Sequence, residues 1–101
     1  MKMTHHTKVE RKDRVDYILD TVGLGEPMVD SFVEERNHWE RLTTTGVLIV
    51  LDPSKKIVVT LYVPTVSKAV AVYCSGTHRS RVPENKMKLF RYNERNFLNK
   101  A

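Results

Sequence analysis

The sequence contains few of the residues that mark disulfide-bonded, metal-binding or membrane-spanning proteins. Cys74 is the single cysteine among 101 residues, so the chain forms no internal disulfide, as is usual in a reducing cytoplasm. The four histidines are scattered and do not form a metal-ligand pattern. No apolar run approaches the roughly 20 residues that span a membrane. Residues 1–14 are polar and charged and do not resemble a signal peptide. We therefore expect a cytoplasmic protein without a metal site or a membrane segment.

Glycine is also scarce, with four residues in the whole chain. The segment Gly23-Leu24-Gly25 lacks the third glycine and the preceding strand of a phosphate-cradling loop. This shortage disfavours enzymes that bind a nucleotide cofactor, and we expect the protein to use no cofactor.

Positive charge is concentrated at the two ends of the chain. The formal net charge is +5. Residues 1–14 hold five basic and two acidic residues, residues 15–74 hold five and eight, and residues 75–101 hold seven and two. This distribution suits an anionic partner, most often a nucleic acid, and fits equally well a solvated surface with a basic tail.

Two β-branched runs around an Asp-Pro-Ser turn predict an antiparallel hairpin. Val47–Leu51 is apolar throughout, which is typical of a central strand covered on both faces. Ile57–Val63 alternates in its second half, so Thr60 and Tyr62 share one face.

The segments around this hairpin are predicted from their spacing and their turn residues. Apolar residues at helical spacing predict a helix over 8–22, and Pro83 begins a final helix that runs to about residue 100. Residues 28–33 fit a strand better than a helix, and residues 68–74 lean to a helix although a strand remains an alternative.

Together these elements predict an α+β domain. We expect an N-terminal helix, a three- to four-stranded antiparallel β-meander and one or two C-terminal helices. Residues 1–7 are expected to form a flexible leader and residues 8–101 a single domain, of which 75–101 is a basic C-terminal extension.

The remaining chemical groups are those that metal-independent ribonucleases use. Such enzymes need a base for the 2′-hydroxyl, an acid for the leaving 5′-oxygen, and cations for the phosphate. The candidate bases and acids are His6, His38, Glu40, His78 and Tyr62. The candidate cations are Arg11, Arg14, Arg36, Arg41, Arg79 and Arg81, and Thr60 is a hydrogen-bond donor for phosphate. A basic domain of this length contains many such groups by chance.

The central segment resembles a known family. The sequence from Glu40 to Asp52, ERLTTTGVLIVLD, followed by IVVTLY at 57–62, is similar to the strand core of small phage and Gram-positive bacterial proteins related to RelE/ParE-type ribonuclease toxins. The likeness covers about residues 5–74, and the Thr-Gly-Val and Val-Thr-x-Tyr pieces are its specific part. Residues 75–101 have no counterpart in the pattern.

The resemblance implies an RNA-binding and RNA-cleaving domain that needs no metal. In it His6 would be the acid or base, Arg41 the phosphate clamp, and Thr60 and Tyr62 the residues that face the substrate. The nucleic-acid-binding residues are then expected to be Arg11, Arg14, Arg79, Arg81, Lys86 and Lys88. This hypothesis requires Arg41 to converge on the face of the sheet that bears Thr60 and Tyr62.

Two other hypotheses remain open at the level of the sequence. One is a non-enzymatic phage or mobile-element protein that binds and modulates a host protein or a nucleic acid, and the other is a structural phage component. The partners expected are a nucleic acid, with RNA preferred over DNA, or a host or antitoxin protein. A homodimer is a further option, and no membrane partner is expected.

Overall fold

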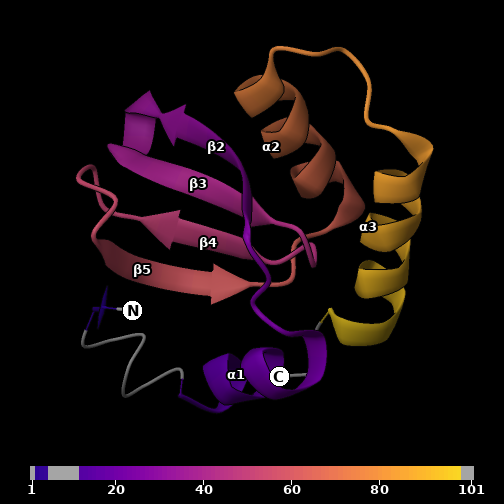
Figure 1. Ribbon diagram of the computed structural model, residues 1–101. Helices are drawn as coiled ribbons and strands as arrows, with labels where there is room; N and C mark the ends of the chain where they lie inside the picture. The colour runs from indigo at the N-terminus through magenta and orange to yellow at the C-terminus, as the bar shows by residue number, and fades with distance from the viewer. Residues whose placement is uncertain (1, 5–11, 99–101) are drawn as a thin grey trace.

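The computed structural model describes residues 2–4 and 12–98 and forms an α+β fold (Figure 1). The strands are β1 (Lys2–Met3), β2 (Pro27–Val33), β3 (His38–Thr43), β4 (Leu48–Leu51) and β5 (Ile57–Tyr62). The helices are α1 (Lys12–Tyr17), which continues as a π-helical turn η2 (Ile18–Val22), a 3-10 turn η3 (Glu34–Arg36), α2 (Val66–Thr77) and α3 (Glu84–Phe97). In the described ranges, no helix is long and apolar enough to cross a membrane.

The five strands form one mixed sheet in the order β1-β5-β4-β3-β2. Strands β2 to β5 pair antiparallel, each with its neighbour in the chain, whereas β1 lies parallel to β5. Beyond the two residues of β1, Thr4 continues this edge, because its backbone N–H donates to the carbonyl of Val58 at 2.8 Å.

The predicted architecture is wrong at the N-terminal side and in the number of strands. The first described element is a strand, so the first helix follows β1 and does not begin the fold, and the sheet has five strands and is mixed. A strand of two residues is too short to show the alternation that sequence patterns detect, and its partner is far along the chain. Residues 2 and 3 of the expected leader form β1, and the rest of that leader, like the expected helix start at residue 8, lies outside the described residues apart from Thr4.

The predicted hairpin is confirmed as β4 and β5. Local hydrogen bonds explain its turn and also the turn that joins β3 to β4. Between β4 and β5, the Asp52 carboxylate accepts the backbone N–H groups of Lys56 and Ile57, both at 2.9 Å. Between β3 and β4, Gly46 donates to the carbonyl of Thr43 at 3.0 Å and has a φ of +85°, as the left-handed position of a three-residue hairpin loop requires.

Both ambiguous segments adopt the structure that the sequence favours. Residues 27–33 form β2, which pairs with β3 from Pro27 to Val33. Residues 66–77 form α2, and the Thr65 side chain accepts the backbone N–H of Lys68 at its N-terminus. Glu94 on α3 accepts the backbone N–H of Val66 at 2.6 Å, so the two C-terminal helices are tied together where α2 begins.

The sheet has two faces, each with its own core. The side that carries Leu42, Leu48 and Tyr62 is called the α2 face, because these residues pack with α2 and α3 around the buried Phe90. We call α1 face the side that carries Ile49 and Leu61, which pack with residues of α1 and η2. In Figure 1, α1 lies below the sheet, and α2 stands to the right of β2 and β3, between the sheet and α3.

Gly46 and Asn93 form a tight contact that is testable by a double-mutant cycle. Asn93 is buried and donates to the carbonyl of Thr45 at 2.7 Å, and a Cβ added to Gly46 would clash with the Asn93 amide nitrogen. We expect Gly46→Ala to lower the free energy of unfolding by about 2 kcal/mol or more, through backbone strain and this clash. In an Asn93→Ala background the same change should cost less, because only the strain remains.

Urea denaturation of the four proteins measures this coupling. Equal costs of Gly46→Ala in both backgrounds would show that the amide contact is not what excludes a side chain at position 46.

Candidate functional site

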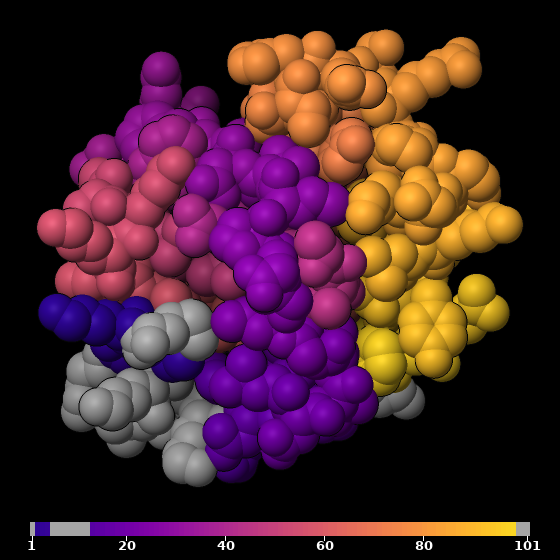
Figure 2. Space-filling model, viewed as in Figure 1, coloured from indigo at the N-terminus to yellow at the C-terminus, as the bar shows by residue number. Residues whose placement is uncertain are grey.

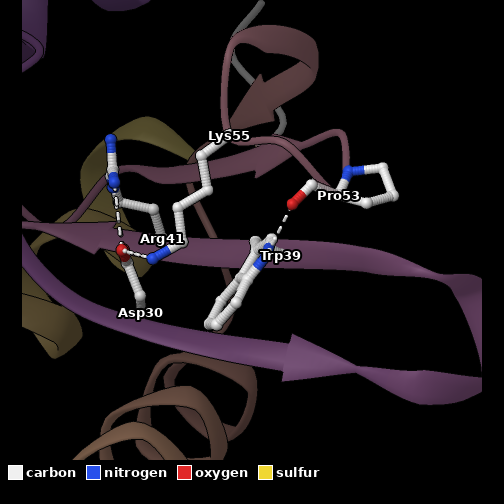
Figure 3. Close-up of polar contacts among 5 residues, drawn as sticks. All are labelled: Asp30, Trp39, Arg41, Pro53 and Lys55. Carbon is white, nitrogen blue, oxygen red and sulfur yellow. Dashed lines mark hydrogen bonds and ion pairs between the residues drawn. The ribbon is translucent and has the colours of Figure 1, made fainter.

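Arg41, the expected phosphate clamp, is held by an acidic partner on the α1 face (Figure 3). Its Nε donates to Asp30 Oδ1 at 2.8 Å and one terminal nitrogen donates to Oδ2 at 3.0 Å, a two-pronged arrangement typical of strong Arg–carboxylate pairs. Lys55 Nζ binds the same Oδ2 at 3.0 Å. The hydrogen bonds from Arg41 therefore hold the pKa of Asp30 below its ordinary value, and those from Lys55 add to the effect although partial burial opposes it.

Trp39 completes this group as a packing residue. Its indole N–H donates to the Pro53 carbonyl at 3.1 Å, and Lys55 Nζ lies 3.9 Å from the centre of its ring (Figure 3). Phe32 meets the same ring edge-on, with 5.1 Å between the ring centroids. The indole thus has contacts on its face and its edge, which fits a role in fastening the β4–β5 turn to β3.

Arg41 does not meet Thr60 or Tyr62. Pairing across β3, β4 and β5 sets Arg41 beside Ile49 and Leu61, whereas Thr60 lies beside Val50 and Glu40 in the neighbouring row. Paired residues share a face and adjacent residues in a strand alternate. Arg41 is thus on the α1 face, Thr60 and Tyr62 are on the α2 face, and the convergence that the hypothesis requires is not formed. His6, the fourth expected catalytic residue, lies outside the described residues.

Thr60 and Tyr62 instead line a polar cleft on the α2 face. Its volume is about 710 Å³. The lining residues are Arg36, His38, Glu40, Val50, Val59, Thr60, Tyr62 and Lys68. They come from the end of η3, three strands of the sheet and the first turn of α2, so the cleft lies where α2 leaves the sheet uncovered. We refer to this site as the polar cleft.

Glu40 is the acidic centre of the polar cleft. It is buried, at 7% exposed, and its Oε2 pairs with Lys68 Nζ at 2.8 Å. The Nε2 of His38 lies 4.0 Å from the same oxygen. Because burial removes hydration from a carboxylate, the contact with Lys68 compensates for part of that loss.

Two buried polar atoms of the polar cleft have no hydrogen-bond partner. They are His38 Nε2 and Thr60 Oγ1. Leaving a buried polar group unpaired costs on the order of 1–3 kcal/mol, so such atoms are uncommon unless a ligand or a solvent molecule completes them. His38 and Thr60 therefore each have unused hydrogen-bonding capacity at the lining of the polar cleft.

Tyr62 keeps its proton in this environment. Burial raises the pKa of its hydroxyl above the ordinary value of 10.0, with Glu40 adding to the effect and the positive charges of Lys68, Arg36 and Arg14 opposing it. Arg14, on α1, is thus close enough to act on the same hydroxyl. The cleft and its surroundings combine three cations, one carboxylate, a neutral phenol and an imidazole.

The other expected nucleic-acid-binding residues are distant from the polar cleft or are not described. Arg79 and Arg81 are exposed in the α2–α3 loop, and on α3 Lys88 is exposed while Lys86 is half-buried. The helix α3 packs at the other end of β3, where Asn93 binds Thr45. Arg11 lies outside the described residues.

Lys68 is the cleft residue that sequence reasoning missed. The sequence evidence for its role was weak, because a lysine in the first turn of an uncertain helix cannot be distinguished by sequence from an ordinary exposed lysine. His38, Glu40 and Arg36 were each on the list of candidates, but only the pairing of β3 with β4 and β5 shows that they join Thr60 and Tyr62. In the described part of the chain, no group of three or more His, Cys, Asp and Glu side chains is arranged to hold a metal ion.

Comparisons with known proteins do not assign this site. No protein-family model, curated protein or solved structure matches the chain. The likeness to RelE/ParE-type toxins therefore stays a prediction from the sequence pattern, and the function must be argued from the geometry of the site.

The Asp30–Arg41 pair predicts a pH-dependent contribution to stability. At pH 7, Asp30→Asn should lower the free energy of unfolding by about 1–2 kcal/mol, because Arg41 loses a charged partner. The pKa of Asp30 lies below 3.8 in the folded state, so its stabilisation is complete above that value and is lost as the pH falls through the lower folded-state pKa.

Urea denaturation at pH 7 and pH 2 tests this. The difference between the two proteins should be smaller at pH 2 than at pH 7, and Asp20→Asn, an exposed control, should change stability by less than about 0.5 kcal/mol. A difference for Asp30→Asn that persists unchanged at pH 2 would contradict the ionic origin of the effect.

Proposed function

We propose that the protein binds RNA in the polar cleft and cleaves it without a metal ion. The observation that carries the proposal is the pair of buried, unpartnered polar atoms, His38 Nε2 and Thr60 Oγ1, in a cleft that also holds Lys68 and Arg36. A phosphate oxygen accepts from the Thr60 hydroxyl, and the two cations balance the phosphate charge. The proposal places the protein in the cytoplasm, where RNA is available.

The reaction is an attack of the RNA on its own backbone. His38 accepts the 2′-hydroxyl proton at Nε2, and the 2′-oxygen forms a bond to phosphorus while the bond to the 5′-oxygen breaks. Tyr62 donates its proton to the departing 5′-oxygen, and the proton on His38 later returns to the tyrosinate through solvent. The products are a 2′,3′-cyclic phosphate and a 5′-hydroxyl.

The charged residues act on the transition state. Lys68 and Arg36 stabilise the negative charge that accumulates on the phosphate oxygens as the 2′-oxygen attacks. Glu40, 4.0 Å from His38 Nε2, favours the protonated imidazole that forms in this step, and its ion pair with Lys68 holds the lysine at the cleft. DNA is not a substrate of this chemistry, because it lacks the 2′-hydroxyl.

Removing the imidazole should abolish cleavage. We expect His38→Ala to lower the cleavage rate at least about 100-fold, which is the contribution typical of general base catalysis. The assay follows a labelled single-stranded RNA in the presence of EDTA and identifies the 2′,3′-cyclic phosphate. His78→Asn is the matched control, since His78 is exposed at the end of α2 with a φ of +58° that asparagine tolerates.

Tyr62→Phe separates binding from chemistry. It should retain RNA binding while cleavage falls. RNA that stays intact with the parent protein, or equal cleavage by the parent and His38→Ala, would overturn the catalytic proposal; binding without cleavage would leave the non-enzymatic alternative.

The exposed cations of the α2–α3 loop predict a second effect, on binding alone. If longer RNA also contacts Arg79 and Arg81, the double change to alanine should reduce the salt dependence of binding by roughly one to two units in the log–log slope. Filter binding at several salt concentrations measures the slope. A slope equal to that of the parent protein would show that RNA does not reach this loop.

A further inference from the structure

The α1 face holds a second hollow, separate from the polar cleft. Its volume is about 220 Å³. It is lined by Lys2, Leu24, Gly25, Pro27, Arg41, Thr43, Ile49, Leu51, Lys55, Lys56 and Val58. In Figure 2, the indigo atoms of residues 2–4, which include one of these lysines, lie beside the pink-red atoms of the β4–β5 turn.

The floor of this hollow is apolar. Ile49, Leu51 and Val58 are at most 5% exposed and belong to the core on the α1 face, and Leu24 packs against the same core. Burial of a hydrocarbon group against such a surface is favourable because it removes apolar area from water. The floor therefore suits the apolar part of a ligand.

Among the described residues, the lining contains four basic residues and no acidic residue. Asp30, the acidic partner of Arg41 and Lys55, has both carboxylate oxygens occupied by these two residues, and the Asp52 carboxylate accepts the backbone N–H groups of Lys56 and Ile57. Lys56, at the opening, forms no ion pair with any residue in the described ranges, whereas Lys2 pairs with Ile57 and so shares the face opposite that of Val58. Like charges at one opening repel each other, and an anion bound between them relieves that repulsion.

We propose that this hollow binds a small organic carboxylate with an apolar tail. The carboxylate lies between Lys56 and Arg41, whose second terminal nitrogen makes no hydrogen bond to a described residue, and the tail lies against Ile49 and Val58. At about 30 Å³ for a group the size of a water molecule, the volume holds roughly seven such groups, which corresponds to hexanoate or octanoate. The site is independent of the proposed RNA cleavage, because it lies on the opposite face of the sheet.

Titration calorimetry and amide NMR of the full chain test the proposal with butyrate, hexanoate and octanoate as probes. Affinity should rise about fourfold for each added methylene until the hollow is full. Octan-1-ol and octylammonium should bind at least about tenfold more weakly than octanoate, because they lack the negative charge. The shifts should centre on Ile49, Leu51 and Val58.

A charge reversal at the opening provides the decisive comparison. Lys56 is exposed in the β4–β5 turn, so Lys56→Glu leaves the core intact and should weaken octanoate binding at least about tenfold. The matched control is Lys88→Glu on α3, which should bind octanoate as the parent protein does. RNA cleavage by the parent protein should be unchanged at saturating octanoate.

Three results would overturn the proposal. They are no saturable binding of octanoate, equal binding of octanoate and octan-1-ol, or equal binding by Lys56→Glu and the parent protein. Shifts produced by inorganic phosphate as strongly as by octanoate would also overturn it, because the apolar floor would then make no contribution.

Discussion

The register of β3 against β4 places Glu40 opposite Val50 and Arg41 opposite Ile49, so two neighbouring residues of one strand serve opposite faces of the sheet. All the polar chemistry described above depends on this alternation. A slip by one residue would turn Glu40 into the core on the α1 face and Arg41 toward α2. The short Thr44–Gly46 loop and the Asn93 amide that binds it hold the register at the end of the hairpin.

Much of the fold was predictable because it depends on local patterns. The hairpin has β-branched runs and an Asp-Pro-Ser turn, β2 begins at a proline, and α3 follows Pro83 with a glutamate in its first turn. The strand β1 was not predictable, since two residues carry no period and the pairing with β5 spans more than fifty positions. That one strand turns an antiparallel meander into a mixed sheet and changes the order of the first elements.

The candidate site also combines features that local sequence patterns predict with features that they do not. Alternation in β5 puts Thr60 and Tyr62 together, and the composition singles out His38 and Glu40 as titratable groups. These four residues come together in one cleft only through the pairing of three strands. Lys68 reaches the same cleft because α2 begins beside β3. Arg41 has the side chain that a phosphate-binding site requires. Its partner Asp30, however, lies on the neighbouring strand β2, and no local sequence pattern predicts that the two residues pair.

The short parallel strand β1 has a consequence for aggregation while the molecule folds. It covers the outer edge of β5, whose backbone groups would otherwise be open to a strand from another molecule, and Thr4 extends the cover through the carbonyls of Val58 and Val59. The covering residues are translated before β5 and cannot dock until β5 has left the ribosome. A nascent chain, or one shortened at its start, would therefore present an edge prone to intermolecular β-aggregation.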